Sequence, residues 1–297
     1  MNFNHLKVFW AVAKNLSYSR AAEELYLSQP TVSIQLKKLE EALGLDLLEQ
    51  LGKKIYLTQA GELLYPYVNR IFSLATEAES AIQELKGLRA GRIIIGASTT
   101  PGIYLLPAII SSFQQNYPRL EISLEISNTH QVQEHLLLNQ LDLGVVGEEL
   151  TIDPQLIIQP LLADKLLIIA AKEHPLALRK SVSFAEFLTQ RLILRERGSS
   201  TREILEQSVH SRGLQLKVAM QLNSIEAIKQ AVIANLGVSV ISKLTVGMEV
   251  KAGLLRAIPF SDLSLSRHIN LAYHKEKKLS PVMQAFVQDI KKQLLGK

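Results

Sequence analysis

Two short helical patterns follow one another almost directly in residues 17–44, and this pair constrains the fold more than any other feature of the sequence. In the first pattern, SYSRAAEEL, we expect Ser19 to cap the helix, with acidic residues following where the helix dipole favours them. Ala21 and Ala22 are small enough to let a second helix approach closely. Because almost no chain separates the two patterns, they predict a tightly packed helical pair.

The second pattern has clear ends and two different faces. Ser28 is the expected N-cap, Pro30 lies in the first turn, where its missing N–H is tolerated, and Gly44 ends the helix. The expected buried stripe consists of Val32, Leu36, Leu39 and Leu43. The opposite face carries mostly hydrogen-bonding residues at its start and lysines further along: Gln29, Thr31, Ser33, Ile34, Lys37 and Lys38. This distribution is typical of a recognition helix, which meets base edges and phosphates, although a solvated face on an ordinary helical hairpin is the alternative.

The flanking segments favour the DNA-binding interpretation. A preceding helix is predicted by the apolar residues Leu6, Val8, Phe9, Val12 and Ala13. Residues 47–58, LLEQLGKKIYLT, predict two short strands around Gly52, with Lys53 and Lys54 at the tip. We therefore predict a winged helix-turn-helix domain in residues 1–58 that binds double-stranded DNA.

The stretch from Phe9 to Gly61 resembles the LysR-type transcriptional regulators, most specifically in its Ala-Ala pair followed by Ser-Gln-Pro-x-Val-Ser. The resemblance implies that the bases are approached by Gln29, Pro30, Thr31 and Ser33, and the DNA backbone by Lys37, Lys53 and Lys54. It also implies a homotetramer built from two dimers that bends its promoter DNA. The sequence departs from the family at Ile34, where an arginine or another polar residue is common, and at Gln50, where arginine is usual.

Residues 59–90 predict a long helix that begins after Thr58, with apolar residues at alternating spacings of three and four. These positions are Leu64, Tyr67, Ile71, Leu74, Ala78, Ala81, Leu85 and Leu88. Such a seam packs either on its own domain or on a second copy of the helix. We predict dimerisation through this seam, which also corresponds to the linker helix of the family that the sequence resembles.

From Gly91 onward, short apolar runs alternate with helical patterns. Buried strands are expected at 92–98, 141–147, 166–172, 192–196 and 238–242, and helices at 103–116, 130–140, 202–213, 224–237 and 280–296. The alternation predicts an α/β domain with mostly parallel strands, so the whole chain falls in the α+β multidomain class. The resemblance implies that residues 91–297 form a two-lobed effector-binding domain like a periplasmic solute-binding protein. Lobe I is expected at about 91–162 and 266–297, and lobe II at about 163–265.

Two strand-to-helix junctions in this domain are rich in hydroxyl groups: GASTTPG at 96–102 and RERGSSTR at 195–202. Helix starts present free N–H groups to anions, and Arg195, Arg197 and Arg202 add positive charge, so the junctions predict a site for a small anion. The alternative is that the hydroxyls only cap helices. The resemblance implies effector contacts by Ser98, Thr99, Thr100, Thr129, Ser199, Ser200 and Thr201. Both junctions are similar to those of LysR-type regulators of carbon-fixation genes.

Other chemistry finds little support. There is no cysteine, the seven histidines lack metal-ligand spacing, and no Gly-x-Gly-x-x-Gly or Walker motif is present. A nucleophile elbow at Ser98 is disfavoured because Thr100 stands at the second glycine position. We therefore expect no enzyme activity, no metal and no cofactor. The alternatives are a solute-binding module without DNA binding and a serine hydrolase that uses Ser98.

Charge and hydropathy add two expectations. The net charge is +5, yet residues 1–90 contain ten basic and ten acidic residues, so DNA binding has to be inferred from pattern and not from bulk charge. No apolar run reaches the roughly 18 residues of a membrane span, and the N-terminus has no signal-peptide pattern. We expect a cytoplasmic protein.

Overall fold

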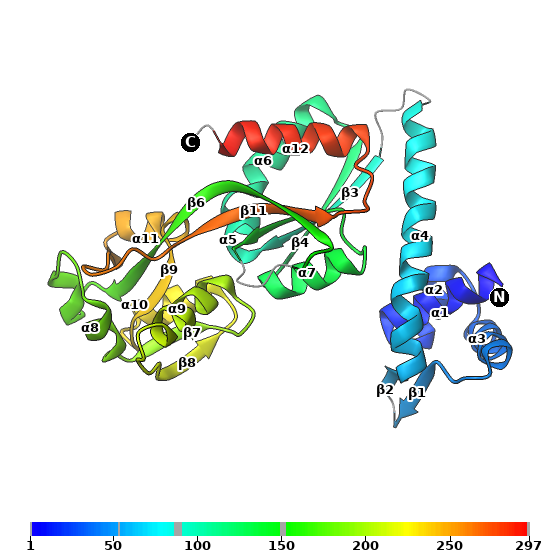
Figure 1. Cartoon of the computed structure of the whole chain (residues 1–297), viewed down its shortest axis with the longest axis horizontal. Helices are drawn as coiled ribbons and strands as arrows, with labels where there is room; N and C mark the ends of the chain where they lie inside the picture. Colours follow the sequence, from blue (N-terminus) through cyan, green and yellow to red (C-terminus); the bar gives the residue numbers. More distant parts are fainter. Residues whose placement is uncertain (1, 53, 86–90, 149–152, 296–297) are drawn as a thin grey trace. The chain divides into compact units, whose positions relative to one another are not determined.

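The computed structural model describes residues 2–52, 54–85, 91–148 and 153–295. The chain divides into two compact units (Figure 1). The smaller unit comprises Met1–Ile82 and takes in Leu138–Gln140, and the larger comprises Gln83–Leu137 and Leu141–Lys297.

The smaller unit begins with three packed helices, α1 (Phe3–Asn15), α2 (Tyr18–Leu25) and α3 (Gln29–Leu43). All five apolar residues predicted for the first helix are buried, together with Ala21 and Ala22. The predicted cap at Ser19 is wrong, because α2 begins earlier and the hydroxyl of Ser17 accepts the hydrogen bond from the Arg20 N–H.

Helix α3 has the predicted ends. The Ser28 hydroxyl accepts a hydrogen bond from the Thr31 N–H, and Gly44 adopts the left-handed conformation, with φ of +69°. Val32, Leu36 and Leu39 are buried in the core of the unit. Leu43 is 38% exposed, contrary to expectation, because it is the last residue of the helix.

A hairpin and a long helix follow. Strands β1 (Leu48–Leu51) and β2 (Lys54–Leu57) pair in antiparallel fashion around Gly52, which has φ of +64°. Lys54 is exposed at the start of β2, whereas Lys53 lies outside the described residues. Helix α4 (Gln59–Leu85) continues through Pro66, and its first turn is capped by the Thr58 hydroxyl, which accepts from the Gly61 N–H.

The larger unit is built on a seven-stranded sheet in the order β10-β6-β11-β5-β3-β4, with β9 also paired to β6. Its strands are β3 (Gly91–Ser98), β4 (Leu120–Ser127), β5 (Leu143–Gly147), β6 (Leu156–Ala171), β9 (Ser239–Ser242), β10 (Leu255–Ile258) and β11 (Ser266–His274). A two-stranded sheet joins β7 (Leu192–Arg195) and β8 (Val218–Leu222). The expectation of mostly parallel strands is wrong. Strand β3 pairs in parallel with β4 and β5, and β7 with β8, but every pairing of β6 and β11 is antiparallel.

Strands β6 and β11 connect two hydrophobic cores (Figure 1). The first core includes Ile95, Phe113 and Phe286, and we call the part of the unit around it lobe I. The second includes Ile168, Phe184 and Phe187, and the part around it is lobe II.

Helices cover both lobes. The predicted helix at 103–116 is two helices, α5 (Thr99–Tyr104) and α6 (Leu106–Asn116), and α7 (Thr129–Leu137) and α12 (Pro281–Leu294) complete lobe I. Lobe II contains α8 (Phe184–Leu188), α9 (Ser200–His210), α10 (Ile225–Ile233) and α11 (Gly247–Lys251). Two short 3-10 helices, η1 (Pro175–Leu178) and η2 (Lys243–Thr245), lie in its loops.

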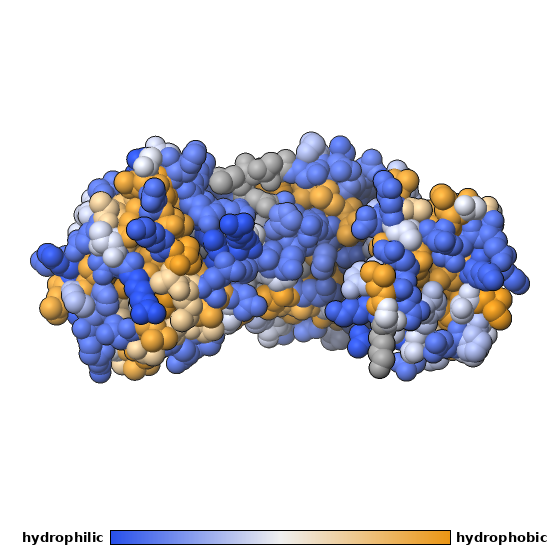
Figure 2. All heavy atoms as spheres, turned by 90° about the horizontal axis from the view of Figure 1, so that it is seen from below, coloured by the Kyte–Doolittle hydropathy of each residue, from blue (hydrophilic) through white to orange (hydrophobic). Residues whose placement is uncertain are grey.

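The surface is mainly hydrophilic on the face shown in Figure 2, with smaller apolar patches. Among the described residues, no helix is both long enough and apolar enough to cross a bilayer.

Candidate functional site

The open face of α3 carries the residues predicted to meet DNA. Gln29, Pro30, Ser33 and Lys37 are exposed. Thr31 is half-buried, and its hydroxyl lies 2.7 Å from that of Ser28. The Gln29 amide oxygen accepts a hydrogen bond from the Ser19 hydroxyl at 3.1 Å, so Ser19 orients Gln29 instead of capping α2.

A small cavity in the larger unit lies where several strands end and helices begin. It opens to solvent, and its empty volume, the open part included, is about 190 Å³. The described residues that line it are Ser98, Thr99, Thr100, Asn128, Thr129, Arg195, Ser199, Ser200 and Arg267. The structure therefore brings together the hydroxyls of both predicted junctions and adds Asn128 and Arg267, which the sequence did not indicate.

Two serines at the cavity directly precede helices, but their side chains do not cap them. Ser98 precedes α5 and Ser199 precedes α9, but neither side chain makes a capping hydrogen bond. By contrast, Ser28, Ser224 and Ser280 each accept a backbone N–H at the start of α3, α10 and α12. The Ser98 hydroxyl instead accepts a hydrogen bond from the Gly147 N–H at 3.1 Å.

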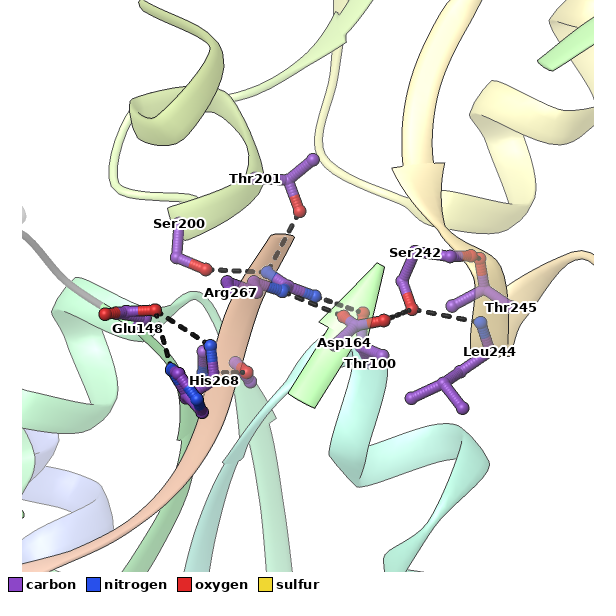
Figure 3. A network of polar contacts seen from close by, with 12 residues as sticks. Thr100, Glu148, Asp164, Ser200, Thr201, Ser242, Leu244, Thr245, Arg267 and His268 are labelled. Carbon is purple, nitrogen blue, oxygen red and sulfur yellow. Dashed lines mark hydrogen bonds and ion pairs between the residues drawn. The ribbon is translucent and has the colours of Figure 1, made fainter. Parts of the chain in front are cut away.

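The side chain of Arg267 is the centre of the polar network at this cavity (Figure 3). Its guanidinium donates to Ser200 at 2.6 Å, Thr201 at 3.0 Å and Thr100 at 3.1 Å, so hydroxyls from both lobes converge on one cation. The Nε atom donates to Asp164 at 2.9 Å. Arg267 comes from β11, a strand that was not predicted, and the sequence of this strand mixes polar and apolar residues, so it gives no clear signal.

Each of the two arginines at the cavity pairs with one carboxylate, Arg267 with Asp164 and Arg195 with Glu196. Burial lowers the pKa of Arg267, Asp164 opposes this shift, and the nearby positive charge of Arg195 lowers the pKa further. Asp164 is also shared, because it accepts a 2.6 Å hydrogen bond from Ser242. Two guanidinium groups therefore face a small cavity that is rich in hydroxyls, an arrangement that attracts an anion.

The three arginines of the second junction have different positions. Arg195 lines the cavity and donates to the Thr99 hydroxyl at 3.2 Å, while two further hydrogen bonds hold it to Glu196. Arg202 is buried but is not among the lining residues, because it donates to Glu206, Gln221 and the Arg195 carbonyl. Arg197 is exposed.

The lining also bears on the hydrolase alternative. None of the described residues that line the cavity is a histidine or a carboxylate, so Ser98 has no general base there.

Helix α4 presents apolar side chains in two directions. Leu64 packs against the core of its own unit. Tyr67 and Leu74 are 65% and 54% exposed, Ala78 is exposed, and Ile71 is half-buried. The side chains of Ala81 and Leu85, and the whole of Leu88, lie outside the described residues.

Comparisons with known proteins cover nearly the whole chain. The family model "LysR substrate binding domain" matches residues 86–295, and the model "Bacterial regulatory helix-turn-helix protein, lysR family" matches residues 3–62. The transcriptional activator CmpR of Synechocystis sp. is 38% identical over 284 residues, which cover 96% of this chain and 93% of CmpR. The RuBisCO operon transcriptional regulator of Allochromatium vinosum is 35% identical over 289 residues, covering 96% of this chain and 94% of that protein. A solved structure of the regulatory domain of Synechocystis PCC6803 CcmR in complex with 2-PG is 30% identical, with a TM-score of 0.64, and covers 68% of this chain and 97% of that domain.

Proposed function

Because the chain belongs to the LysR family of bacterial transcriptional regulators, we propose that it controls carbon-fixation genes in response to a small anionic metabolite bound between lobes I and II. The observation that carries the effector part is the convergence of hydroxyls from both lobes on Arg267. A ligand held by both lobes has a different affinity for different lobe arrangements, which is the requirement for switching.

The effector is a small acid that carries a phosphate or a carboxylate group, or both. Ser199 begins an 11-residue helix without a capping hydrogen bond, so its hydroxyl and the first N–H groups of α9 can donate to anionic oxygens. Arg195 and Arg267 supply charge-assisted hydrogen bonds. The complex of the CcmR regulatory domain with 2-phosphoglycolate supports this class of ligand.

The cavity lining supports effector contacts by Ser98, Thr99, Thr100, Thr129, Ser199, Ser200, Arg195 and Arg267. We add Thr201, which does not line the cavity but accepts a hydrogen bond from Arg267. Arg202 is assigned to the support of Arg195, because its guanidinium donates to the Arg195 carbonyl at 3.0 Å.

The DNA contacts follow from the open face of α3. We assign base contacts to Gln29, Pro30, Thr31 and Ser33 and a phosphate contact to Lys37, supported by the exposure of most of these residues at the start of α3. The exposed apolar side chains of α4 support self-association, first as a dimer and then as a tetramer of two dimers. Dimerisation would double the number of base-contacting helices and raise the affinity for paired half-sites.

Titration calorimetry with 2-phosphoglycolate tests the effector site. Thr100→Val and Thr201→Val keep the side-chain shape but leave a guanidinium N–H or a ligand oxygen without its partner, so each should weaken binding about 5- to 100-fold. Thr189→Val is the control, because Thr189 is exposed on lobe II and donates to the Glu186 carbonyl. A gel shift with the upstream DNA of the gene should show unchanged ligand-free DNA binding in all three variants. Normal ligand affinity in both cavity variants would contradict the assignment.

A further inference from the structure

A second cavity lies beside the effector cavity and is larger, with an empty volume of about 660 Å³. Its described lining residues are Gln133, Val146, Gly147, Glu148, Ile158, Pro160, His268 and Asn270. Except for Gln133, which comes from α7, they belong to or directly follow the adjacent strands β5, β6 and β11. Asn270 is opposite Val146 on one side and Pro160 on the other, so the three side chains share one face of the sheet.

We propose that this second cavity binds a small uncharged molecule in which a carboxamide-like N–H and C=O edge is attached to an apolar ring. The cavity is separate from the anion site, and nothing in the proposed regulatory function requires it. Its ligand would be a second signal, and the chemical class follows from three properties of the lining.

The first property is a pair of buried side-chain amides. Gln133 is 8% exposed and Asn270 is 7% exposed. Within the described part of the chain, neither side-chain amide has a hydrogen-bond partner, and neither has an atom sealed completely from solvent. Because both residues line the cavity, their donors and acceptors are available to a ligand there. A ligand that offers both an N–H and a C=O group matches an amide, because each amide presents one group of each kind.

The second property is the sign of the charge. Glu148 lies at the cavity and accepts a 2.8 Å hydrogen bond from the His268 backbone N–H, while the His268 ring Nδ1 lies 3.3 Å from the same carboxylate oxygen (Figure 3). These two side chains are the ionisable groups among the described lining residues. Both side chains are about half exposed, and a carboxylate paired with a histidine favours an anion less than the two arginines of the neighbouring cavity do, so we expect acids to bind more weakly here.

The third property is the apolar wall. Val146 of β5 lies on one side of Asn270, and Pro160 and Ile158 of β6 lie on the other, so apolar side chains flank the Asn270 amide. A flat ring buries well against such side chains, and small-molecule sites commonly combine an apolar wall with a few polar groups that fix orientation. The ring and the amide edge together define the ligand.

The two cavities share a wall, which would link their occupancies. Gly147 lines the second cavity, and its backbone N–H donates to the hydroxyl of Ser98, which lines the effector cavity. There is no room for a side chain at Gly147, because a Cβ atom would lie 2.2 Å from the Ser200 hydroxyl oxygen. Arg267 and His268 are consecutive in β11, and therefore point to opposite faces. A ligand beside His268 thus contacts the strand that carries the arginine of the anion site, and linkage requires any coupling to be reciprocal.

Binding of nicotinamide and of nicotinate to the full-length protein, followed by ligand-observed NMR and competition, tests the inference. The two probes have the same ring and nearly the same shape, but only nicotinamide is an uncharged amide. We expect nicotinamide to bind with a dissociation constant in the millimolar range and nicotinate to bind at least 10-fold more weakly. Uracil and its 6-carboxylate form a second matched pair with the same expected order.

Substitutions of the two lining amides test whether nicotinamide binds in the second cavity. Asn270→Leu and Gln133→Leu should each reduce nicotinamide binding at least 10-fold. Gln159→Leu is the control, because Gln159 is the neighbour of Pro160 in β6 and its amide donates to Tyr273 instead of facing the cavity. Retained binding of 2-phosphoglycolate by the two cavity variants would exclude misfolding. The proposal is overturned if both pairs of probes fail to bind, if amide and acid bind equally, or if both cavity variants bind nicotinamide normally. None of these results would affect the anion site, which Thr100→Val tests separately.

Discussion

Replacing Arg267 with methionine should show how strongly the central cation of the proposed effector cavity is coupled to Asp164. Arg267 and Asp164 are 4% and 1% exposed and are joined by a 2.9 Å ion pair. The substitution would leave the Asp164 carboxylate buried with the Ser242 hydroxyl as its remaining hydrogen-bond donor among the described residues. Breaking one side of a buried ion pair costs about 3–5 kcal/mol, so the free energy of unfolding of the larger unit should fall by that amount.

The double variant Arg267→Met with Asp164→Asn separates coupling from packing. It removes both charges, so we expect it to be more stable than Arg267→Met alone, because an amide is buried at lower cost than an unpaired carboxylate. Urea unfolding followed by circular dichroism measures both. A loss of about 3–5 kcal/mol corresponds to a midpoint shift of about 1–5 M urea at slopes of about 1–3 kcal/mol per M.

The chain contains its own reference for this experiment. Its single tryptophan, Trp10, lies in α1 of the smaller unit, so tryptophan fluorescence follows that unit. The fluorescence transition should stay in place while the circular dichroism transition of the larger unit moves. If the single and double variants lose the same stability, Arg267 does not compensate Asp164 and the electrostatic reasoning about the cavity is wrong.

Three further predictions concern DNA contacts, assembly and the contact between the lobes. Gln29→Ala should weaken specific DNA binding by about 1–3 kcal/mol with little change in non-specific binding. Lys37→Ala should instead weaken binding to all sequences and flatten the salt dependence of the affinity. Gel shifts at several salt concentrations measure both effects, and an unchanged operator preference in Gln29→Ala would contradict the assignment of the base contacts. If two α4 helices pack together, Leu74→Asp would bury an unpaired charge between them, so the mass measured by light scattering should fall. An unchanged mass would contradict the proposed α4 interface. Burial lowers the pKa of Lys229, but its hydrogen bonds to two carboxylates and to Tyr104 raise it overall above its ordinary value of 10.5. A basic group with a raised pKa contributes its full stabilisation at every pH below its ordinary pKa. Lys229→Met should therefore lower the free energy of unfolding by about 1–3 kcal/mol, and by the same amount at about pH 6 and at about pH 9. A loss of stability that is smaller at pH 9 than at pH 6 would contradict the assignment.

The sequence by itself determined the local structure of the smaller unit, because the signals there are short-range. A serine cap, a proline in the first turn and a glycine that takes a positive φ mark the ends of α3 within a few residues. The periodicity of Val32, Leu36 and Leu39 identified the buried face. The error at Ser19 is also local in origin. Ser17 and Ser19 are both good caps, and the choice depended on the contact of Ser19 with Gln29 in the next helix.

The sequence also located β3, β5, part of β6, β7 and β9 in the larger unit, but it missed β4, β8, β10 and β11 and could not give the partners of any strand. Runs such as 92–98 and 238–242 are apolar enough to be recognised as buried strands. Their alternation with helices suggested parallel pairing, whereas β6 and β11 pair in antiparallel fashion across about a hundred residues of chain. Strand direction is set by which strands become neighbours, and that is a property of the whole fold.

At the proposed effector cavity, the sequence indicated the hydroxyls, and the tertiary structure decided which arginine lies among them. Residues 98–100 and 199–201 were recognisable because a strand-to-helix junction rich in serine and threonine is a contiguous pattern. Arg267 stands alone in its strand, and it meets Thr100 across 167 positions of the sequence. Arg195, Arg197 and Arg202 seemed equivalent in the sequence, yet the fold turns them to the cavity, to solvent and to Gln221 respectively. Side-chain direction at such positions depends on the packing of distant strands and helices, which no local pattern encodes.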